Sequence, residues 1–209
     1  ARLGDWHGVE PERVLPASGG SEAIRRLTLA AMLSGVTRVC VPQPGFGDYA
    51  AAAHALGLQV TGYDDAFELA DALTLPSLVW VCDPNNPTGA SFGPAEWTAV
   101  ALALGQSGSQ LVVDQAYDAL RLAGGCALPQ PIADGAWRLV CPNKAFGLTG
   151  VRGAYLIGPR DGLWIDRVEE LAPSWVLSSE GQALLEAWTT PSIRNELEAS
   201  LPLLREWRE

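Results

Sequence analysis

A single lysine is the residue in this sequence most suited to covalent chemistry. Lys144 is the only lysine among 209 residues, and it follows the apolar run 137–142 in a glycine-spaced stretch, NKAFGLTG. A lysine just after an apolar strand can lose hydration, which lowers its pKa and makes the amine available for Schiff-base formation. An exposed surface lysine is the alternative, which its uniqueness and its glycine-spaced setting disfavour.

A carboxylate stands at the end of another apolar run. Asp114 closes the segment QLVVD at 110–114, and an unpaired carboxylate in such surroundings costs free energy. We therefore expect a cationic partner for it, such as a protonated ring nitrogen. A structural salt bridge, or a cap on the following turn, are the alternatives.

The stretch SGGSEAI at 18–24 is suited to an anion. Two glycines stand immediately before a predicted helix, so free backbone N–H groups of Gly20 and Ser21, at the positive end of the helix dipole, would face a phosphate. The alternative is an ordinary helix start with Ser18 or Ser21 as the N-cap. Glu22 would repel a phosphate unless its side chain points away.

Three further side chains could complete a site for a flat, phosphorylated ligand. Asn86 lies between two prolines in DPNNPTG (83–89), which would hold its amide in a fixed direction toward a ligand hydroxyl; Phe46, between glycines, could cover a ring; and Arg152 offers a planar fork suited to phosphate. A plain loop, a packed aromatic and a solvated arginine are the corresponding alternatives.

Alternating strands and helices must position these residues. Short apolar runs predict buried strands, and helix-like stretches separate most of them; the strands are expected at 37–42, 58–63, 77–83, 110–114, 137–142 and 153–159, and the helices at 21–35, 48–57 and 93–105. This alternation predicts an α/β fold with a largely parallel sheet and helices on its faces, followed after about Pro159 by further helices interrupted by a Pro-Ser pair. Ligands of open α/β sheets bind beyond the carboxyl ends of the strands. Asp83, Asp114 and Lys144 should therefore meet at one edge.

Composition excludes several classes of function. The 14 Lys+Arg and 24 Asp+Glu residues give a net charge of −10, which opposes the phosphate neutralisation that nucleic-acid binding requires. No apolar run reaches the ~20 residues needed to cross a bilayer, and the N-terminal stretch lacks the apolar core of a signal peptide. We expect a cytoplasmic protein without nucleic-acid or membrane partners. Its four cysteines lack a C-x-x-C pair, which favours buried free thiols over a metal site or disulfides.

Five stretches together resemble a known family. SGGSEAI, PGFGDY, DPNNPTG, VVDQAY and NKAFGLTGVRG occur in this order along the chain. The sequence thereby resembles the class I/II aminotransferases, pyridoxal-phosphate (PLP) enzymes of fold type I, and within them the branch of the histidinol-phosphate aminotransferases and threonine-phosphate decarboxylases. The resemblance implies a three-layer αβα large domain. It also implies that Lys144 forms the Schiff base with PLP and then acts as the acid and base.

The resemblance assigns the other site residues one by one. Asp114 would pair with the protonated ring nitrogen and Phe46 would stack on the ring, while Asn86 and Tyr117 would hydrogen-bond the ring hydroxyl oxygen. The phosphate would be held by Gly20, Ser21 and Arg152. The chain has Asn143 where the family commonly has serine or threonine, and we expect its amide to donate to the phosphate instead.

The resemblance also divides the chain. Residues 1–160 would be the PLP-binding core, and residues 161–209 a helical segment leading toward a small domain that is missing or truncated here. Family members are homodimers, and an arginine of the small domain binds the substrate carboxylate. We find no match for that arginine, because Arg194, Arg205 and Arg208 lie in the tail without the motif.

The predicted activity is transamination of an amino acid or an amino-alcohol phosphate. The alternatives are a threonine-phosphate decarboxylase-like lyase, which uses the same cofactor site, and a PLP-binding fragment without turnover. The orientation of the substrate decides which bond breaks, so residues around the cofactor do not separate the first two. A nucleotide-binding α/β domain is a weaker interpretation, since no G-x-G-x-x-G or G-x-x-x-x-G-K-[ST] motif follows a strand.

Overall fold

A single twisted sheet forms the centre of the protein. The computed structural model describes residues 1–208. Its seven strands lie in the order β1-β7-β6-β5-β4-β2-β3. Their bounds are β1 Val14–Ala17, β2 Arg38–Pro42, β3 Gln59–Tyr63, β4 Leu78–Cys82, β5 Gln110–Asp114, β6 Trp137–Val140 and β7 Ala154–Ile157.

The strand directions bring several chain segments to one edge of the sheet. Strands β3, β2, β4, β5 and β6 pair in parallel, and β7 is antiparallel to both β6 and β1. The carboxyl ends of β1, β2, β4, β5 and β6 therefore share an edge, and β7 begins there. Because ligands bind beyond the carboxyl ends of parallel strands, this edge is where a site is expected.

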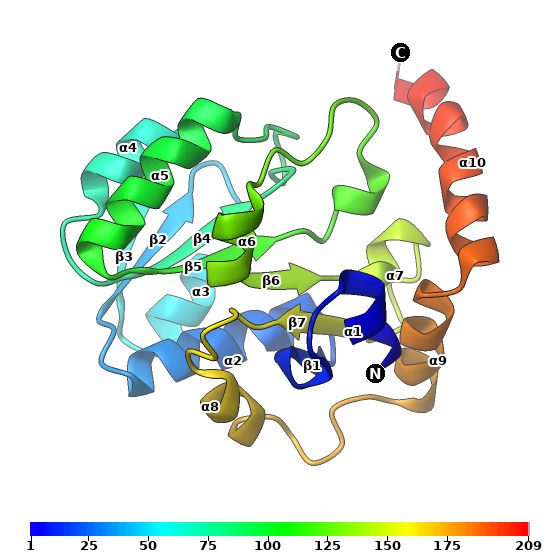
Figure 1. Cartoon of the computed structure of the whole chain (residues 1–209), viewed down its shortest axis with the longest axis horizontal. Coiled ribbons are helices and arrows are strands. Elements are labelled where there is room, and N and C mark those ends of the chain that lie inside the picture. The colour runs from blue at the N-terminus through cyan, green and yellow to red at the C-terminus, as the bar shows by residue number, and fades with distance from the viewer. Residues whose placement is uncertain (209) are drawn as a thin grey trace.

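Helices cover both faces of the sheet (Figure 1). One face carries α2, α3 and α8, and the other carries α4 and α5. Side chains alternate between the two faces of the sheet along each strand, as the two-residue period of β-structure requires. In β4, Trp80 belongs to the core beneath α2 and α3, whereas Val79 and Val81 belong to the core beneath α4 and α5. The prediction of a three-layer, mostly parallel α/β fold is confirmed.

The helices differ in length and place. They are α1 Arg2–His7, α2 Gly20–Leu33, α3 Asp48–Ala55, α4 Ala66–Ala72, α5 Pro94–Ser107, α6 Gln130–Gly135, α7 Pro142–Ala145, α8 Ile165–Glu170, α9 Ser179–Trp188 and α10 Pro191–Arg208, with 3-10 turns at Pro11–Arg13 and Asp118–Leu120. Helices α9 and α10 stand beside β6 and β7, away from α4 and α5 (Figure 1). A third core joins them to α1 through Tyr155, Trp188 and Leu197. None of the helices described over residues 1–208 is long and apolar enough to cross a membrane.

The predicted elements differ from the observed ones at particular residues. Strand β1 was not predicted, because Pro16 cannot donate to a ladder and its run is only four residues long. Helix α4 was also not predicted, although Asp65 caps it by accepting hydrogen bonds from the amides of Phe67 and Glu68. The helix expected at 93–105 continues to Ser107. Gly105 lies within it, and Gly108, in the left-handed conformation, ends it.

Candidate active site

One cavity at the carboxyl edge of the sheet collects the residues that the sequence pointed to. All nine of the predicted cofactor contacts line it, and five other residues complete its wall. We call this cavity the Lys144 pocket; its lining is Gly20, Ser21, Ile24, Phe46, Tyr49, Cys82, Asn86, Asp114, Ala116, Tyr117, Cys141, Asn143, Lys144 and Arg152. The pocket is assembled from segments that follow β1, β2, β4, β5 and β6 and from the segment that precedes β7.

Lys144 reaches the pocket from the short helix α7, directly after β6. Its Nζ lies 5.9 Å from the centroid of the Tyr117 ring. The residue is exposed, so the expectation that the lysine is desolvated is wrong for this structure. Within the four-residue helix that follows the strand, the neighbouring residue Asn143 is buried, whereas Lys144 is not.

Asp114 is a buried carboxylate with two hydrogen-bond donors. Its Oδ2 accepts from the Tyr49 hydroxyl at 2.7 Å, and its Oδ1 accepts from the Ala116 amide at 2.9 Å. The contact with Ala116 is the turn cap considered as an alternative, and among residues 1–208 no salt bridge to Asp114 is found.

The ionisation of Asp114 reflects these surroundings. Burial raises the pKa of the Asp114 carboxyl above its usual range, while the two hydrogen bonds and the positive charge of Lys144 act in the opposite direction. A cation placed in the pocket would lower this pKa further and stabilise the carboxylate.

Tyr49 is a site residue that the sequence analysis missed. It is fully buried in α3, where its ring stacks on Trp80 with centroids 4.7 Å apart and meets Phe46 edge-on at 5.7 Å. Tyr49 therefore contacts both Phe46, which was predicted to cover a ligand ring, and the buried carboxylate of Asp114. The available signal was its spacing, because Tyr49 comes three residues after Phe46 in PGFGDY, at the start of a predicted helix.

The start of α2 forms one end of the pocket. The helix starts at Gly20 with Gly19 as its N-cap, so neither Ser18 nor Ser21 is the N-cap that the alternative required. The first amides of a helix lack acceptors within the helix, and the Arg152 guanidinium packs against Gly19 beside them. A Cβ on Gly19 would lie 2.3 Å from Arg152 Nη2, so only glycine permits this approach.

Two neighbouring side chains of this end are held by other residues. The Ser21 hydroxyl donates its proton to the Asp48 carboxylate. Only the backbone amide of Ser21 is therefore available to donate a hydrogen bond to an anion. The Glu22 side chain folds back to pair with Arg26 at 2.9 Å and to accept from the Ser18 amide at 3.1 Å. Glu22 is thereby turned away from the pocket, as an anion site at this end requires.

The loop after β4 carries Asn86 to the pocket. This loop is closed by a hydrogen bond from the Asn85 amide to the Ala90 carbonyl at 2.8 Å. The Asn85 side-chain amide donates to the Pro44 carbonyl at 3.0 Å, which links this loop to the segment that carries Phe46. This hydrogen bond joins the two loops that carry Asn86 and Phe46.

Two cysteine thiols, those of Cys82 and Cys141, also line the Lys144 pocket. Burial, with the nearby Asp114 carboxylate, raises the pKa of the Cys82 thiol to about 12 and also raises the pKa of Cys141. Both thiols are therefore protonated at neutral pH and inert as nucleophiles. Cys40 is buried as well, but Cys126 is exposed, so the expectation of buried thiols is wrong for that residue. No group of three or more metal-ligating side chains was found among the described residues.

The tail arginines lie outside the Lys144 pocket. The Arg194 guanidinium stacks between Trp188 and Trp6, at 4.3 Å and 5.5 Å from their ring centroids. Arg205 donates from Nε to the Leu122 carbonyl at 2.6 Å. Neither side chain lines the pocket.

Comparison with known proteins identifies the family. The model of the family "Aminotransferase class I and II" matches residues 1–208. The chain belongs to this family. The histidinol-phosphate aminotransferase of Polaromonas naphthalenivorans is 31% identical to this chain over a 177-residue alignment, which covers 79% of this chain and 46% of that enzyme. The chain thus spans about half the length of the curated relative that it matches.

Solved structures agree with this assignment. An aminotransferase from Mycobacterium tuberculosis superimposes with a TM-score of 0.81 at 25% identity, covering 96% of this chain and 58% of that one. The L-threonine-O-3-phosphate decarboxylase of Porphyromonas gingivalis superimposes with a TM-score of 0.73 at 21% identity, over 93% of this chain and 60% of the decarboxylase. The second likeness concerns the fold alone.

Proposed function

We propose that this chain binds pyridoxal phosphate in the Lys144 pocket and is the cofactor-binding part of an aminotransferase. The substrate class that we propose is an amino acid or an amino-alcohol phosphate, converted to a keto product. The name of the Polaromonas relative, a histidinol-phosphate aminotransferase, supports an amino-alcohol phosphate. The observation that carries the proposal is that one cavity combines a primary amine, a buried carboxylate and an anion-binding helix start.

The residues of the pocket fit this cofactor in three respects. The close packing of Arg152 on Gly19 beside the first amides of α2 suits a phosphate monoester. The carboxylate of Asp114, buried and without a salt bridge among residues 1–208, suits a protonated ring nitrogen. The amine of Lys144 lies near Tyr117, so a covalent linkage and a hydrogen bond to the ring hydroxyl oxygen can be made together.

Each residue then has a chemical task. PLP, when bound, supplies an electrophilic carbonyl carbon and a ring that accepts electrons from the substrate. Lys144 Nζ anchors the cofactor covalently and, once released, takes the proton from the α-carbon of the amino substrate. Asp114 keeps the ring nitrogen protonated, and Phe46 covers the ring. Gly20, Ser21, Asn143 and Arg152 hold the phosphate, while Asn86 and Tyr117 donate to the ring hydroxyl oxygen.

The assembly and location belong to the same proposal. A homodimer is the assembly that the family resemblance implies, and light scattering after gel filtration measures it. Three of the four cysteines are buried free thiols, which fits the reducing conditions of the cytoplasm.

Covalent labelling tests the cofactor site directly. The purified chain is mixed with PLP, its absorbance is recorded, and the complex is reduced with borohydride before peptide mapping by mass spectrometry. Because the chain has one lysine, a pyridoxyl group has a single side-chain amine to label. We expect the label on the peptide that contains Lys144, and none in Lys144→Arg, which keeps the positive charge. A folded wild-type chain that takes up no label would overturn the proposal.

Product analysis then separates the activities. A keto product formed from the amino substrate supports transamination, and carbon dioxide release supports a decarboxylase instead. Labelling at Lys144 with neither product supports a cofactor-binding unit without turnover.

A further inference from the structure

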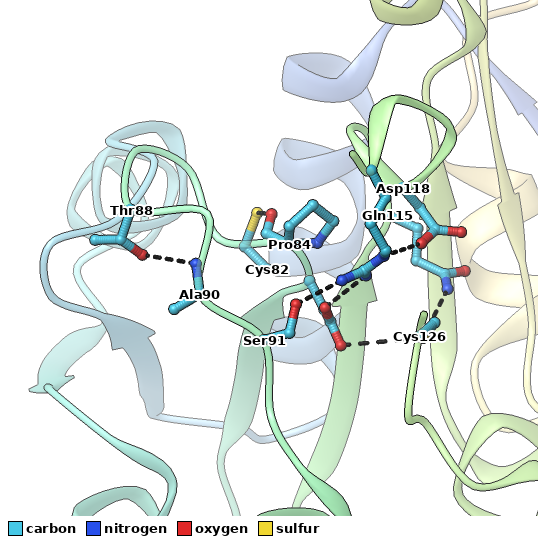
Figure 2. Close-up of polar contacts among 10 residues, drawn as sticks. Cys82, Pro84, Thr88, Ala90, Ser91, Gln115, Asp118 and Cys126 are labelled. Carbon is cyan, nitrogen blue, oxygen red and sulfur yellow. Dashed lines mark hydrogen bonds and ion pairs between the residues drawn. The ribbon is translucent and has the colours of Figure 1, made fainter. Parts of the chain in front are cut away.

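A partly buried arginine outside the pocket joins two of the loops that form it. Arg121 Nη2 lies 2.8 Å from Asp83 Oδ1, its Nε lies 3.0 Å from Asp118 Oδ1, and its Nη1 donates to Ser91 Oγ at 2.6 Å. The Arg121 side chain is 10% exposed and that of Asp83 is 0% exposed. Figure 2 shows Ser91 and Asp118 reaching this guanidinium from different segments of the chain. One side chain therefore uses three nitrogens on three acceptors.

The three acceptors of Arg121 lie close in the sequence to two residues of the Lys144 pocket. Asp83 and Ser91 lie on either side of Asn86 in the loop after β4, and Asp118 follows Tyr117 directly in the loop after β5. Asn86 and Tyr117 both line the Lys144 pocket, whereas Arg121 does not. The planar fork of an arginine can hold several acceptors at fixed angles, which a lysine ammonium cannot do. The contacts of Arg121 consequently fix the two loops relative to each other.

The second carboxylate oxygen of Asp83 lies near the segment that follows β5. Asp83 Oδ2 is 3.9 Å from the Cys126 thiol, and Gln115 Nε2 is also 3.9 Å from that sulfur (Figure 2). These contacts are weak, so the ion pair with Arg121 is the main interaction of this buried carboxylate.

We propose that Arg121 is a positioning residue that holds Asn86 and Tyr117 at the distance from each other that a cofactor ring hydroxyl requires. The inference rests on the proposed function, because it assigns a task to residues of the same pocket. A purely structural ion pair would affect stability alone. A positioning residue also changes how the two donors meet the ring oxygen, and this difference is measurable.

The test uses two variants of Arg121 and a matched control. Arg121→Lys keeps the charge and loses the fork, and Arg121→Gln loses both. Arg160→Gln removes an exposed arginine and controls for the change in net charge. Three properties are measured for each folded protein: backbone hydrogen exchange of residues 84–91 and 115–122 without cofactor, the Kd for PLP, and the absorbance of bound PLP as a function of pH.

The expected results follow from the lost contacts. In Arg121→Lys, the amides of the two loops exchange faster and the Kd for PLP rises about tenfold, the equivalent of one or two weakened hydrogen bonds. Donors to the ring oxygen favour its deprotonated form, so weakening them raises the pKa seen in the absorbance titration by about 0.5 or more. Arg121→Gln shows larger changes, and Arg160→Gln behaves as wild type.

Two results would overturn the inference in distinguishable ways. If Arg121→Lys unfolds more easily but binds PLP and titrates as wild type does, Arg121 is a structural brace and the proposed function is unaffected. If the wild-type chain neither binds PLP nor is labelled at Lys144, the proposed function fails and the positioning role fails with it.

Discussion

Tyr49 donates its hydroxyl proton to Asp114 Oδ2 across 2.7 Å, joining two residues that are 65 positions apart in the sequence. The bond runs from a helix on one face of the sheet to the carboxyl end of a central strand. It satisfies one oxygen of a carboxylate that has no salt-bridge partner among residues 1–208. The bond also lowers the pKa of that carboxyl against the effect of burial. Tyr49 therefore helps to keep a negative charge in the pocket.

Tyr49→Phe should weaken cofactor binding beyond its effect on stability. The substitution keeps the ring stacked on Trp80 but removes the donor to Asp114, and we expect a loss of about 1–2 kcal/mol in the free energy of unfolding. Tyr63→Phe is the matched control, because this equally buried hydroxyl donates to the Trp80 carbonyl at 2.7 Å, away from the carboxylate. Both variants should lose similar stability in urea unfolding. Only Tyr49→Phe should raise the Kd for PLP, and equal Kd values would contradict the role assigned to Tyr49.

Asp114→Asn should leave the chain without cofactor as stable as wild type at pH 7, or more stable. Since burial raises the pKa of this carboxyl, the native state binds its proton more tightly than the unfolded state does. Asp114 therefore makes the free energy of unfolding fall as pH rises from the ordinary aspartate pKa of 3.8 through the raised one. The amide carries no charge and removes this cost. Urea unfolding between pH 3.5 and 7 measures the difference.

Although Asp114→Asn should not destabilise the chain, it should weaken the binding of PLP. Asp114→Asn should weaken PLP binding by at least about tenfold, because the partner of the ring nitrogen is lost. Asp83→Asn is the control: Asp83 is buried as well but is paired with Arg121 at 2.8 Å, so its loss should destabilise the chain by roughly 3 kcal/mol. Equal stability losses in the two variants would show that Asp114 is an ordinary structural carboxylate.

The sequence predicted those features that depend on local pattern. The ends of the apolar runs located Asp114 and Lys144, since the carboxyl ends of parallel strands meet at one edge, and the two glycines before α2 located the helix start that borders the pocket. Burial of individual side chains was harder to predict. Lys144 is exposed because one helical turn separates it from the strand end, a detail that composition does not contain.

Features that depend on contacts between distant segments were not predictable in the same way. Tyr49 reaches Asp114 only because β2 and β4 are neighbours in the sheet although β3 and α4 lie between them in the sequence. The pairing of Asp83 with Arg121 likewise joins loops 38 residues apart. Strand β1 was missed because of its Pro16 and its short run, and it gains its place at the edge of the sheet by pairing with β7, about 140 residues later in the chain.

Gly19→Ala should displace Arg152. Gly19 has φ +112°, a conformation that alanine rarely adopts, and the added Cβ would lie 2.3 Å from Arg152 Nη2. We expect a loss of roughly 1–3 kcal/mol in stability together with a clear rise in the Kd for PLP and for inorganic phosphate. Gly35→Ala separates the two effects, since Gly35 has φ +90° and no atom within 4 Å of a new Cβ. It should lose stability and keep the wild-type Kd values; a similar loss of affinity in both variants would remove Arg152 from the anion site.

His7 should make the chain sensitive to acid. Tyr155 Oη accepts from Trp188 Nε1 at 3.0 Å and lies 2.8 Å from His7 Nε2, a nitrogen that can accept the hydroxyl proton only while the ring is neutral. Burial, with the positive charges of Arg138 and Arg194, lowers the pKa of His7 from 6.5 to about 4. Since the unfolded chain binds this proton more readily, the stability due to His7 is complete above pH 6.5 and is lost as the pH falls toward 4.

The loss due to His7 should reach about 2 kcal/mol, after allowance for the part of the ring that faces solvent. His7→Gln offers Tyr155 an acceptor that does not titrate, so its stability should fall less steeply than that of wild type between pH 6.5 and pH 4.5 in urea unfolding. His54→Gln, which changes the other histidine, exposed in α3, should follow the wild-type curve. Parallel curves for wild type and His7→Gln would show that His7 is protonated without breaking its contact with Tyr155.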